Sequence, residues 1–371
     1  MPSPQATMLS RALARRLAEE LPRRYPHWGA IRTLDAVGGG FSGASLFRVA
    51  SAGGAHAVKL SPVAGDLVEA TNARHRVIEQ LAADGDQPVF PRLQRDASGA
   101  TLWTLHARSE TLMVEARDWL EDAEPGVALS LVDRTPAPSS RDSPARIASA
   151  FELLVRFHDA GNRVGLTDQE RTYLKAPTPL PERYVHEWRQ AASLNLAAVE
   201  AATVRLPLDL REPARDYLFR LPAIAARIAP SFASLPGTSP PLRLCLRDAH
   251  RNNMAYSADV ARAFFDWDAM RFDRRVGDFA RLAASFGLNA DEAENLILSA
   301  LEAVSPIDKW TAWESAALHP VLATQVWLPP LNWLKWLLVE ERTFDDPAAA
   351  FARLRETLNL SILRSFSIGD A

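Results

Sequence analysis

Short apolar runs and alternating polar and apolar positions dominate the first 125 residues, and both patterns are typical of β-strands. Strands are predicted in six segments: 31–37, 44–49, 55–60, 90–94, 101–106 and 111–116. Gly53-Gly54 indicates a hairpin turn between the second and third of them. Apolar residues at helical spacing over residues 66–82 predict a helix after the third strand. We therefore expect a small N-terminal lobe built on an antiparallel sheet.

The pattern becomes helical from about residue 148 onward. The segment 147–158 carries apolar residues at helical spacing and is expected to be buried. Further helices are predicted at 181–202, 210–228, 279–286, 290–304 and 347–360. A stretch rich in Pro and Ser between residues 125 and 144 separates the two patterns. We predict an α+β chain with an N-terminal lobe at residues 1–125 and a large, mainly helical lobe at residues 126–371.

The composition is that of an ordinary soluble globular protein, with 47% hydrophobic and 23% charged residues among 371. A net charge of -3 gives no support for nucleic-acid binding through a basic surface. The single cysteine, Cys245, allows no intrachain disulfide and favours a reducing compartment. We expect a cytoplasmic protein that is a monomer or a homodimer and binds neither nucleic acid nor membrane.

Two segments of the chain have patterns that could be mistaken for targeting or membrane signals. Residues 9–21 form an amphipathic pattern with Glu19 and Glu20, which predicts a surface helix and argues against a transit peptide. Residues 326–339 are the most apolar later segment, but Pro329 and Pro330 interrupt them and they are too short to span a bilayer. Neither segment predicts targeting or membrane insertion.

A glycine cluster and a lysine suggest phosphate binding in the N-terminal lobe. The cluster runs from Gly38 through Gly40 to Gly43 between two predicted strands, and glycine lets backbone N–H groups approach a phosphate closely. Lys59 lies 19 residues after Gly40 in an apolar strand. Beneath a glycine flap Lys59 would hold two phosphates. The alternatives are that Lys59 is an exposed residue of an edge strand and that the glycine cluster is a simple turn.

Three polar residues beside two apolar strands form the strongest chemical pattern. Asp248 follows the first strand, Asn253 comes five residues later, and Asp266 follows the second strand. Phosphoryl transfer needs a carboxylate to accept the proton of the attacking hydroxyl, and oxygen ligands for Mg²⁺. Asp248 suits the first role, and the other two suit the second. The alternative is that these residues only cap helices and turns.

These segments resemble the His-Gly-Asp-x-His-x-x-x-Asn and Ile-Asp-Trp motifs of the aminoglycoside phosphotransferase and choline kinase-like superfamily. Residues 277–282 (Gly-Asp-Phe-Ala-Arg-Leu) look like the Asp-Leu-Ala element that follows them in that family. The glycine loop, Lys59, Phe157-His158 and a hinge-like segment at 115–126 occur in family order. The resemblance covers roughly residues 30–285.

The resemblance implies a two-lobed protein-kinase-like fold and a kinase that phosphorylates a hydroxyl of a small molecule, using Mg²⁺ and ATP, with GTP possible. The N-terminal lobe would bind the nucleotide, and the C-terminal lobe would supply catalysis and the acceptor site. Asp248 would be the general base, His250 would donate to the transferred phosphoryl group, and Asn253 and Asp266 would bind Mg²⁺. Asp278 would tie the loop after the metal-binding aspartate to a helix. Nucleotide contacts are expected at Gly39, Gly40, Phe41, Ser42, Gly43, Lys59, Arg117 and Trp119.

The sequence departs from the family pattern at two places. Leu246-Arg247 replaces the His-Gly before the general base. The helix at 66–82 should supply a glutamate partner for Lys59 and offers Glu69, Glu79 or neither. Arg74 or His75 stands at the aligned position. These departures leave a nucleotide-binding pseudokinase or regulatory scaffold as the alternative function.

The acceptor cannot be identified from the sequence. Aminoglycosides, choline-like amines, sugars and amino-acid alcohols all remain open. Acidic residues at 340–341 and 345–346 could attract a cationic acceptor, although a solvated helix end is the simpler interpretation.

Overall fold

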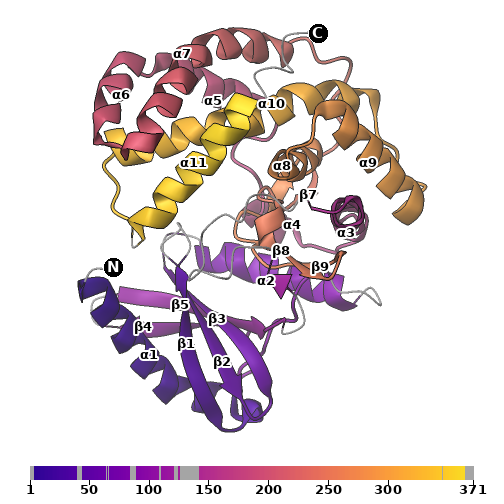
Figure 1. Cartoon of the computed structure of the whole chain (residues 1–371). Coiled ribbons are helices and arrows are strands. Elements are labelled where there is room, and N and C mark those ends of the chain that lie inside the picture. Colours follow the sequence, from indigo (N-terminus) through magenta and orange to yellow (C-terminus); the bar gives the residue numbers. More distant parts are fainter. Residues whose placement is uncertain are drawn as a thin grey trace.

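The structure, a computed structural model, describes residues 4–39, 44–63, 65, 67–83, 89–107, 110–120, 124–125, 142–344 and 346–363. A five-stranded antiparallel sheet forms its N-terminal part (Figure 1). The strands are ordered β1-β2-β3-β5-β4, and their bounds are β1 (Ile31–Gly39), β2 (Ser45–Ser51), β3 (Gly54–Pro62), β4 (Leu102–Ala107) and β5 (Glu110–Asp118). The predicted antiparallel sheet is confirmed.

The prediction of a strand at residues 90–94 is wrong. This segment runs beside β5 through a single bridge between Leu93 and Arg117. Its apolar residues Val89, Phe90 and Leu93 are buried in the core of the helical part instead. An apolar run of this length serves equally well as a buried connection, because burial alone does not require a hydrogen-bonded ladder.

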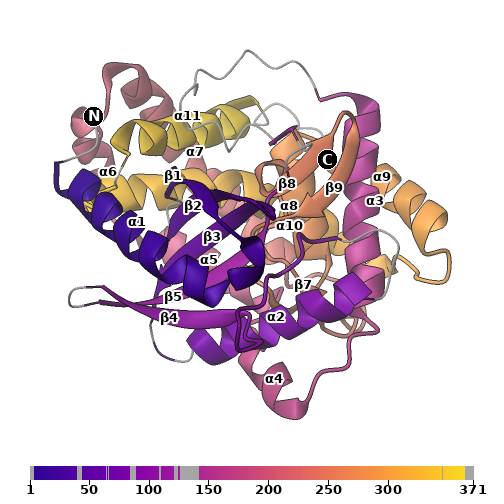
Figure 2. The same cartoon turned by 90° about the horizontal axis from the view of Figure 1, so that it is seen from below.

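Helix α1 (Pro4–Arg24) confirms the predicted N-terminal amphipathic helix. Leu13, Leu17 and Leu21 recur at helical spacing and are buried against the sheet together with Trp28. The helix therefore covers one side of the sheet (Figure 2), and Arg15, Arg16 and Glu19 on it are exposed.

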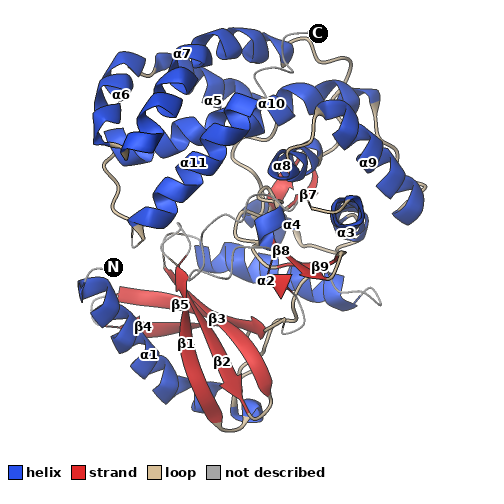
Figure 3. Ribbon diagram, in the orientation of Figure 1, coloured by secondary structure: helices blue, strands red, loops and turns tan. Residues whose placement is uncertain are grey.

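Helices make up most of the remaining described chain (Figure 3). They are α3 (Pro144–Gly161), α4 (Asp168–Tyr173), α5 (Glu182–Ser193), α6 (Leu196–Ala202), α7 (Leu208–Ser231), α8 (Val276–Phe286), α9 (Ala290–Val304), α10 (Ala312–Leu334) and α11 (Pro347–Leu363). The predicted helix at 181–202 is two helices, because Asn195 caps a new one by accepting a hydrogen bond from the Ala198 N–H. None of the described helices combines the length and apolar character that crossing a bilayer needs.

The long helix α10 was not predicted. It contains Pro320, Pro329 and Pro330, and it is buried on nearly all sides. A helix that is apolar all round has no amphipathic period to detect, and proline normally predicts the end of a helix. Trp327 and Trp333 on this helix are buried in the core.

Short strands in the helical part position the candidate site residues. β7 (Arg243–Cys245) pairs with β10 (Arg271–Asp273), and β8 (Met254–Ser257) pairs with β9 (Val260–Phe264) and with β6 (Glu124–Pro125). Asp248 follows β7, Asn253 directly precedes β8, and Asp266 follows β9. The three residues therefore lie in the turns next to these short strands.

Helix α2 (Leu67–Ala83) connects the sheet to the helical part. Its residues Ala73, Val77, Ile78 and Leu81 are buried in the same core as the helices that follow. The lobe boundary predicted between residues 125 and 126 falls at the edge of the described residues, and it stays a prediction.

Candidate active site

The loop before Asp248 is held by a buried carboxylate of α8. The N–H groups of Leu246 and Arg247 donate to Asp278 Oδ2 and Oδ1 at 2.8 and 2.6 Å. Arg247 has φ +63, a left-handed conformation that glycine adopts more easily. Asp278 thus fixes the turn that delivers Asp248, whereas the sequence predicted that it would tie down the loop after Asp266.

Asp248 is held on both of its carboxylate oxygens. Arg281 donates to Oδ1 from Nη2 at 2.9 Å and from Nε at 3.2 Å, and the side-chain amide of Asn253 donates to Oδ2 at 3.1 Å. Burial would raise the pKa of Asp248, but the charge of Arg281, with help from His250 and Asn253, outweighs it and holds this pKa at about 2. The carboxylate is therefore ionised and oriented at neutral pH.

His250 is buried beside Asp248 and is neutral at neutral pH, because burial lowers its pKa to about 4. Its Nδ1 accepts a hydrogen bond from the Asn252 N–H at 3.2 Å. The ring proton is consequently on Nε2, which lies 3.8 Å from Asp248 Oδ2. His250 can act as a neutral hydrogen-bond donor in this position.

Lys59 of β3 reaches the loop that follows β9. Its Nζ lies 2.5 Å from Asp268 Oδ2 and 4.0 Å from Asp266 Oδ1. Burial would lower the pKa of Lys59, but the charges of Glu115, Asp268 and Asp266 outweigh it and raise this pKa. The pKa of Asp266 is raised, mainly by burial and then by the neighbouring charges of Asp268 and Asp248. Burial therefore disfavours the ionised form of Asp266, and Lys59 only partly compensates for it.

A carboxylate of the N-terminal sheet also lies opposite Lys59, on the neighbouring strand. Glu115 of β5 is directly opposite Lys59 in the ladder between β3 and β5, so both side chains leave the same face of the sheet. Glu115 Oε2 lies 2.8 Å from His75 Nε2, and its buried Oε1 has no hydrogen-bond partner among the described residues. Burial would raise the pKa of Glu115, but His75 and Lys59 outweigh it and lower this pKa to about 2.

The helix that was expected to carry a glutamate presents two basic residues at this position. Arg74 of α2 donates to the Asp268 carbonyl at 2.8 Å and to Thr71 Oγ1 at 2.6 Å. His75 bonds Glu115 on one side and lies 2.9 Å from Thr101 Oγ1 on the other. Helix α2 therefore holds the Glu115 carboxylate and the backbone of Asp268 in place rather than pairing with Lys59 itself.

Two predicted nucleotide contacts, Arg117 and Trp119, lie at and just after the end of β5. The side chain of Arg117 donates to the Phe265 carbonyl and lies 4.6 Å from the centre of the Trp267 ring. The Trp119 N–H donates to the Ala55 carbonyl at 3.0 Å and is thus used within the sheet. Gly39 ends β1, and the predicted phosphate contacts Gly40, Phe41, Ser42 and Gly43 lie outside the described residues.

A cavity of about 570 Å³ opens beside Asp248. Its walls come from α5, α8, α10 and the loop around β10, and they include the side chains of Arg183, Arg247, Arg281 and Gln325. Arg281 Nη1 donates to Gln325 Oε1 at 3.2 Å. The oriented carboxylate of Asp248 therefore faces a space that is large enough for a small molecule.

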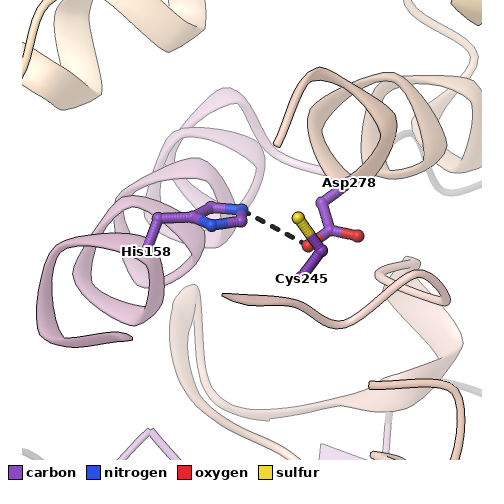
Figure 4. A group of neighbouring side chains, drawn as sticks. All are labelled: His158, Cys245 and Asp278. Atoms are coloured by element: carbon purple, nitrogen blue, oxygen red, sulfur yellow. Dashed lines mark ion pairs between the residues drawn. The ribbon is translucent and has the colours of Figure 1, made fainter. Parts of the chain in front are cut away.

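His158, Cys245 and Asp278 lie close together in the interior (Figure 4). His158 Nε2 is 3.3 Å from Asp278 Oδ2, and all three side chains are buried. Both oxygens of Asp278 already accept backbone N–H groups, and burial raises the pKa of the Cys245 thiol. These features favour a structural role in supporting the Asp248 loop over a metal site.

Sequence reasoning missed three residues of this site: Asp268, Glu115 and Arg281. Asp268 is two residues after Asp266, so its spacing was a usable signal. Arg281 is part of the segment that resembles the family element, but a sequence does not show which way its side chain points. Glu115 meets Lys59 only through strand register, which the sequence pattern leaves open.

The sequence matches a known protein family. A family model described as a phosphotransferase enzyme family matches residues 33–319. The sequence has no significant match among curated proteins.

Solved structures share the fold at low sequence identity. The structure of a spectinomycin phosphotransferase in complex with ADP and spectinomycin superposes with a TM-score of 0.63 at 14% identity, covering 95% of this chain and 98% of that chain. An amicoumacin kinase in complex with AMP-PNP and Ca²⁺ gives 0.57 at 11% identity, covering 93% of each chain. A choline/ethanolamine kinase family protein from Mesorhizobium loti gives 0.52 at 16% identity, covering 95% and 96%. These likenesses show a kinase-like fold.

Proposed function

The chain belongs to the phosphotransferase enzyme family, and from this premise we propose that it transfers the γ-phosphate of ATP to a hydroxyl group of a small molecule. The N-terminal sheet would hold the nucleotide, and the cavity beside Asp248 would hold the acceptor. The division into nucleotide-binding and acceptor-binding lobes is part of the same proposal.

One observation carries the proposal. The Lys59 amino group, from the N-terminal sheet, lies 2.5 Å from Asp268 and 4.0 Å from Asp266, which belong to the helical part. Phosphoryl transfer requires a cation from one side of the nucleotide and metal-binding carboxylates from the other. Asp248 lies near enough to Asp266 for its charge to raise the pKa of that carboxyl. This arrangement supports the proposal, because the groups that the reaction needs would meet between the sheet and the helical part.

The residues present fit a magnesium ion. The pKa of Asp266 is raised by burial and by neighbouring negative charge, and a divalent cation would relieve both. The side-chain nitrogen of Asn253 donates to Asp248, which leaves its oxygen as the atom that would face the ion. Asp266 and Asn253 would therefore hold Mg²⁺, and the bound metal would neutralise charge on the nucleotide phosphates.

Asp248 would orient the acceptor hydroxyl and take its proton. A carboxylate with a pKa of about 2 is a weak base, so it removes the proton only as the new bond to phosphorus forms and the hydroxyl becomes acidic. Arg281 and Asn253 keep the carboxylate in one orientation. Catalysis at this residue therefore depends mainly on positioning.

The residue opposite Lys59 in the sheet favours a kinase over a pseudokinase or scaffold. The scaffold alternative was based on the missing glutamate of the helix at 66–82. Glu115 supplies a buried carboxylate opposite Lys59, and its low pKa keeps it charged. We propose that Glu115 takes over the role of that glutamate and keeps Lys59 ready for the nucleotide phosphates.

The proposal is tested with three variants. Asp266→Ala should remove the Mg²⁺-dependent thermal stabilisation of the protein by ATP, and EDTA should remove it from the wild type. Asp248→Ala should keep this stabilisation but lower ADP formation by about 10²- to 10⁴-fold. Asp259→Ala, which changes an exposed aspartate in the turn between β8 and β9, is the matched control. Nucleotide binding without ADP formation across a broad panel of acceptors would instead favour the scaffold.

A further inference from the structure

The cavity beside Asp248 carries an unusual balance of charge for its size. Four arginines line it, and only two carboxylates do, those of Asp248 and Glu187. The arginines are Arg183, Arg247, Arg271 and Arg281. Its apolar wall includes Leu328 and Pro329 of α10. A ligand in this cavity therefore meets mainly guanidinium groups and an apolar surface.

Two of the arginines share one carboxylate. Asp273 Oδ2 lies 2.6 Å from Arg183 Nη1 and 3.2 Å from Arg247 Nε. Asp273 Oδ1 accepts the N–H groups of Leu180 and Arg274. One buried negative charge is thus divided between two positive charges, and it cannot neutralise both.

Arg247 is the less compensated of the two. No hydrogen bond from its guanidinium is found among the residues that the structure describes, and the side chain is 21% exposed, toward the cavity. Burial and then the positive charge of Arg183 lower the pKa of Arg247. A negative group entering the cavity would relieve this repulsion.

The carboxylates of the cavity offset only part of this positive charge. Asp248 is engaged by Arg281 and Asn253, and Glu187 Oε1 lies 3.8 Å from Arg183 Nε, so both carboxylates have arginine partners other than Arg247. The acidic residues near the end of α10 do not supply a site for a cation either. Glu340 pairs with Lys335 and Arg342, and Glu341 pairs with Arg205.

We propose that the acceptor is a hydroxyl compound that carries an anionic group, a carboxylate or a phosphate, and that Arg247 binds this group while the hydroxyl faces Asp248. The inference rests on the proposed kinase function. Arg247 and Asp248 line the same cavity. One small molecule can therefore reach both side chains. Guanidinium groups bind carboxylates and phosphates through paired hydrogen bonds.

This assignment also gives a reason for the departure at residue 247. A glycine would suit the left-handed backbone there, yet the chain has an arginine at this position. The strained conformation is retained together with a side chain that reaches the acceptor cavity. The arginine is then a specificity-determining residue rather than a packing residue.

The test measures binding without nucleotide or turnover. Isothermal titration calorimetry on the nucleotide-free protein at low salt compares four sugars that share a ring and differ in charge: glucose, glucosamine, glucuronate and glucose 6-phosphate. We expect the two anions to bind at least about tenfold more tightly than glucose, and glucosamine to bind most weakly. The two anionic arms separate carboxylate recognition from phosphate recognition.

The variant Arg247→Gly removes the guanidinium and suits the positive φ, so it should fold. It should weaken binding of the preferred anion by about 10- to 100-fold and leave binding of glucose unchanged. Arg262→Gln, at an exposed position of β9, is the control for loss of one positive charge. Circular dichroism checks the fold of both variants.

The proposal is overturned if neither anion binds more tightly than glucose, if glucosamine binds best, or if Arg247→Gly binds the anion as the wild type does. The comparison of the four sugars on the wild type decides the question even if the variant is unstable. Because the measurement needs no ATP, its failure leaves the kinase proposal standing. Failure of the nucleotide experiments with Asp266→Ala would in turn leave the anion preference intact.

Discussion

Replacing Glu115 by glutamine tests whether the carboxylate opposite Lys59 has taken over the role of the missing helix glutamate. The substitution keeps the shape of the side chain and removes its charge. Glu115 is buried, with 5% of its side chain exposed, and its neighbours lower its pKa from 4.5 to about 2. Because one pKa unit corresponds to about 1.4 kcal/mol, this charge contributes on the order of 3 kcal/mol to stability at neutral pH.

The sign of the pH dependence follows from the direction of the shift. The pKa of Glu115 is lower in the folded protein than in the unfolded chain, so its contribution is complete above pH 4.5 and is lost as the pH falls toward 2. We expect Glu115→Gln to lower the free energy of unfolding by about 1–3 kcal/mol at neutral pH. The difference from the wild type should shrink steadily below pH 4.5.

Urea denaturation followed by circular dichroism at several pH values measures this difference. Other carboxylates titrate alike in both proteins, so the difference isolates position 115. The exposed Glu110 at the start of the same strand supplies the control Glu110→Gln. Loss of the charge opposite Lys59 should also weaken Mg·ATP binding by about tenfold. The reasoning is refuted if Glu115→Gln and Glu110→Gln have equal stability and equal affinity for Mg·ATP.

Two further predictions concern arginines of the helical part. Arg281→Gln removes the charge that does most to offset the effect of burial on the pKa of Asp248. This pKa should therefore rise, and the acid limb of the pH profile of kcat/KM should move to higher pH. Phosphorus NMR of the reaction at several pH values measures the profile, and an unmoved limb would contradict the assigned cause. Arg275→Met leaves Glu314, whose Oε1 is 2.6 Å from Arg275 Nε, as a buried carboxylate without its partner. Unfolding in urea should show a loss of about 3–5 kcal/mol, and a loss below 1 kcal/mol would show that the pair is dispensable.

Local signals were sufficient for much of the fold. Alternating apolar residues predicted β1 to β3, and helical spacing predicted α3, α8 and α9, because apolar positions recur in these segments with the period of a strand or a helix. Helix α10 gave no such signal, since it is buried on nearly all sides and its prolines look like breaks. The segment at 90–94 was mistaken for a strand for a related reason: burial is visible in a sequence, but the hydrogen-bond partner is not.

The sequence by itself determined which residue types stand near which strands. Asp248, Asn253 and Asp266 were found from their spacing, because a turn after a short strand places a polar side chain within a few residues of a predictable point. Only the tertiary structure decided how these residues are held and what they face. Arg281 and Glu115 reach Asp248 and Lys59 from other elements, and strand register and helix rotation set such contacts rather than local spacing. The charge of the cavity beside Asp248 likewise arises where α5, α8 and the segments at β7 and β10 converge, since electrostatic interaction depends on distance in space and not on separation along the chain.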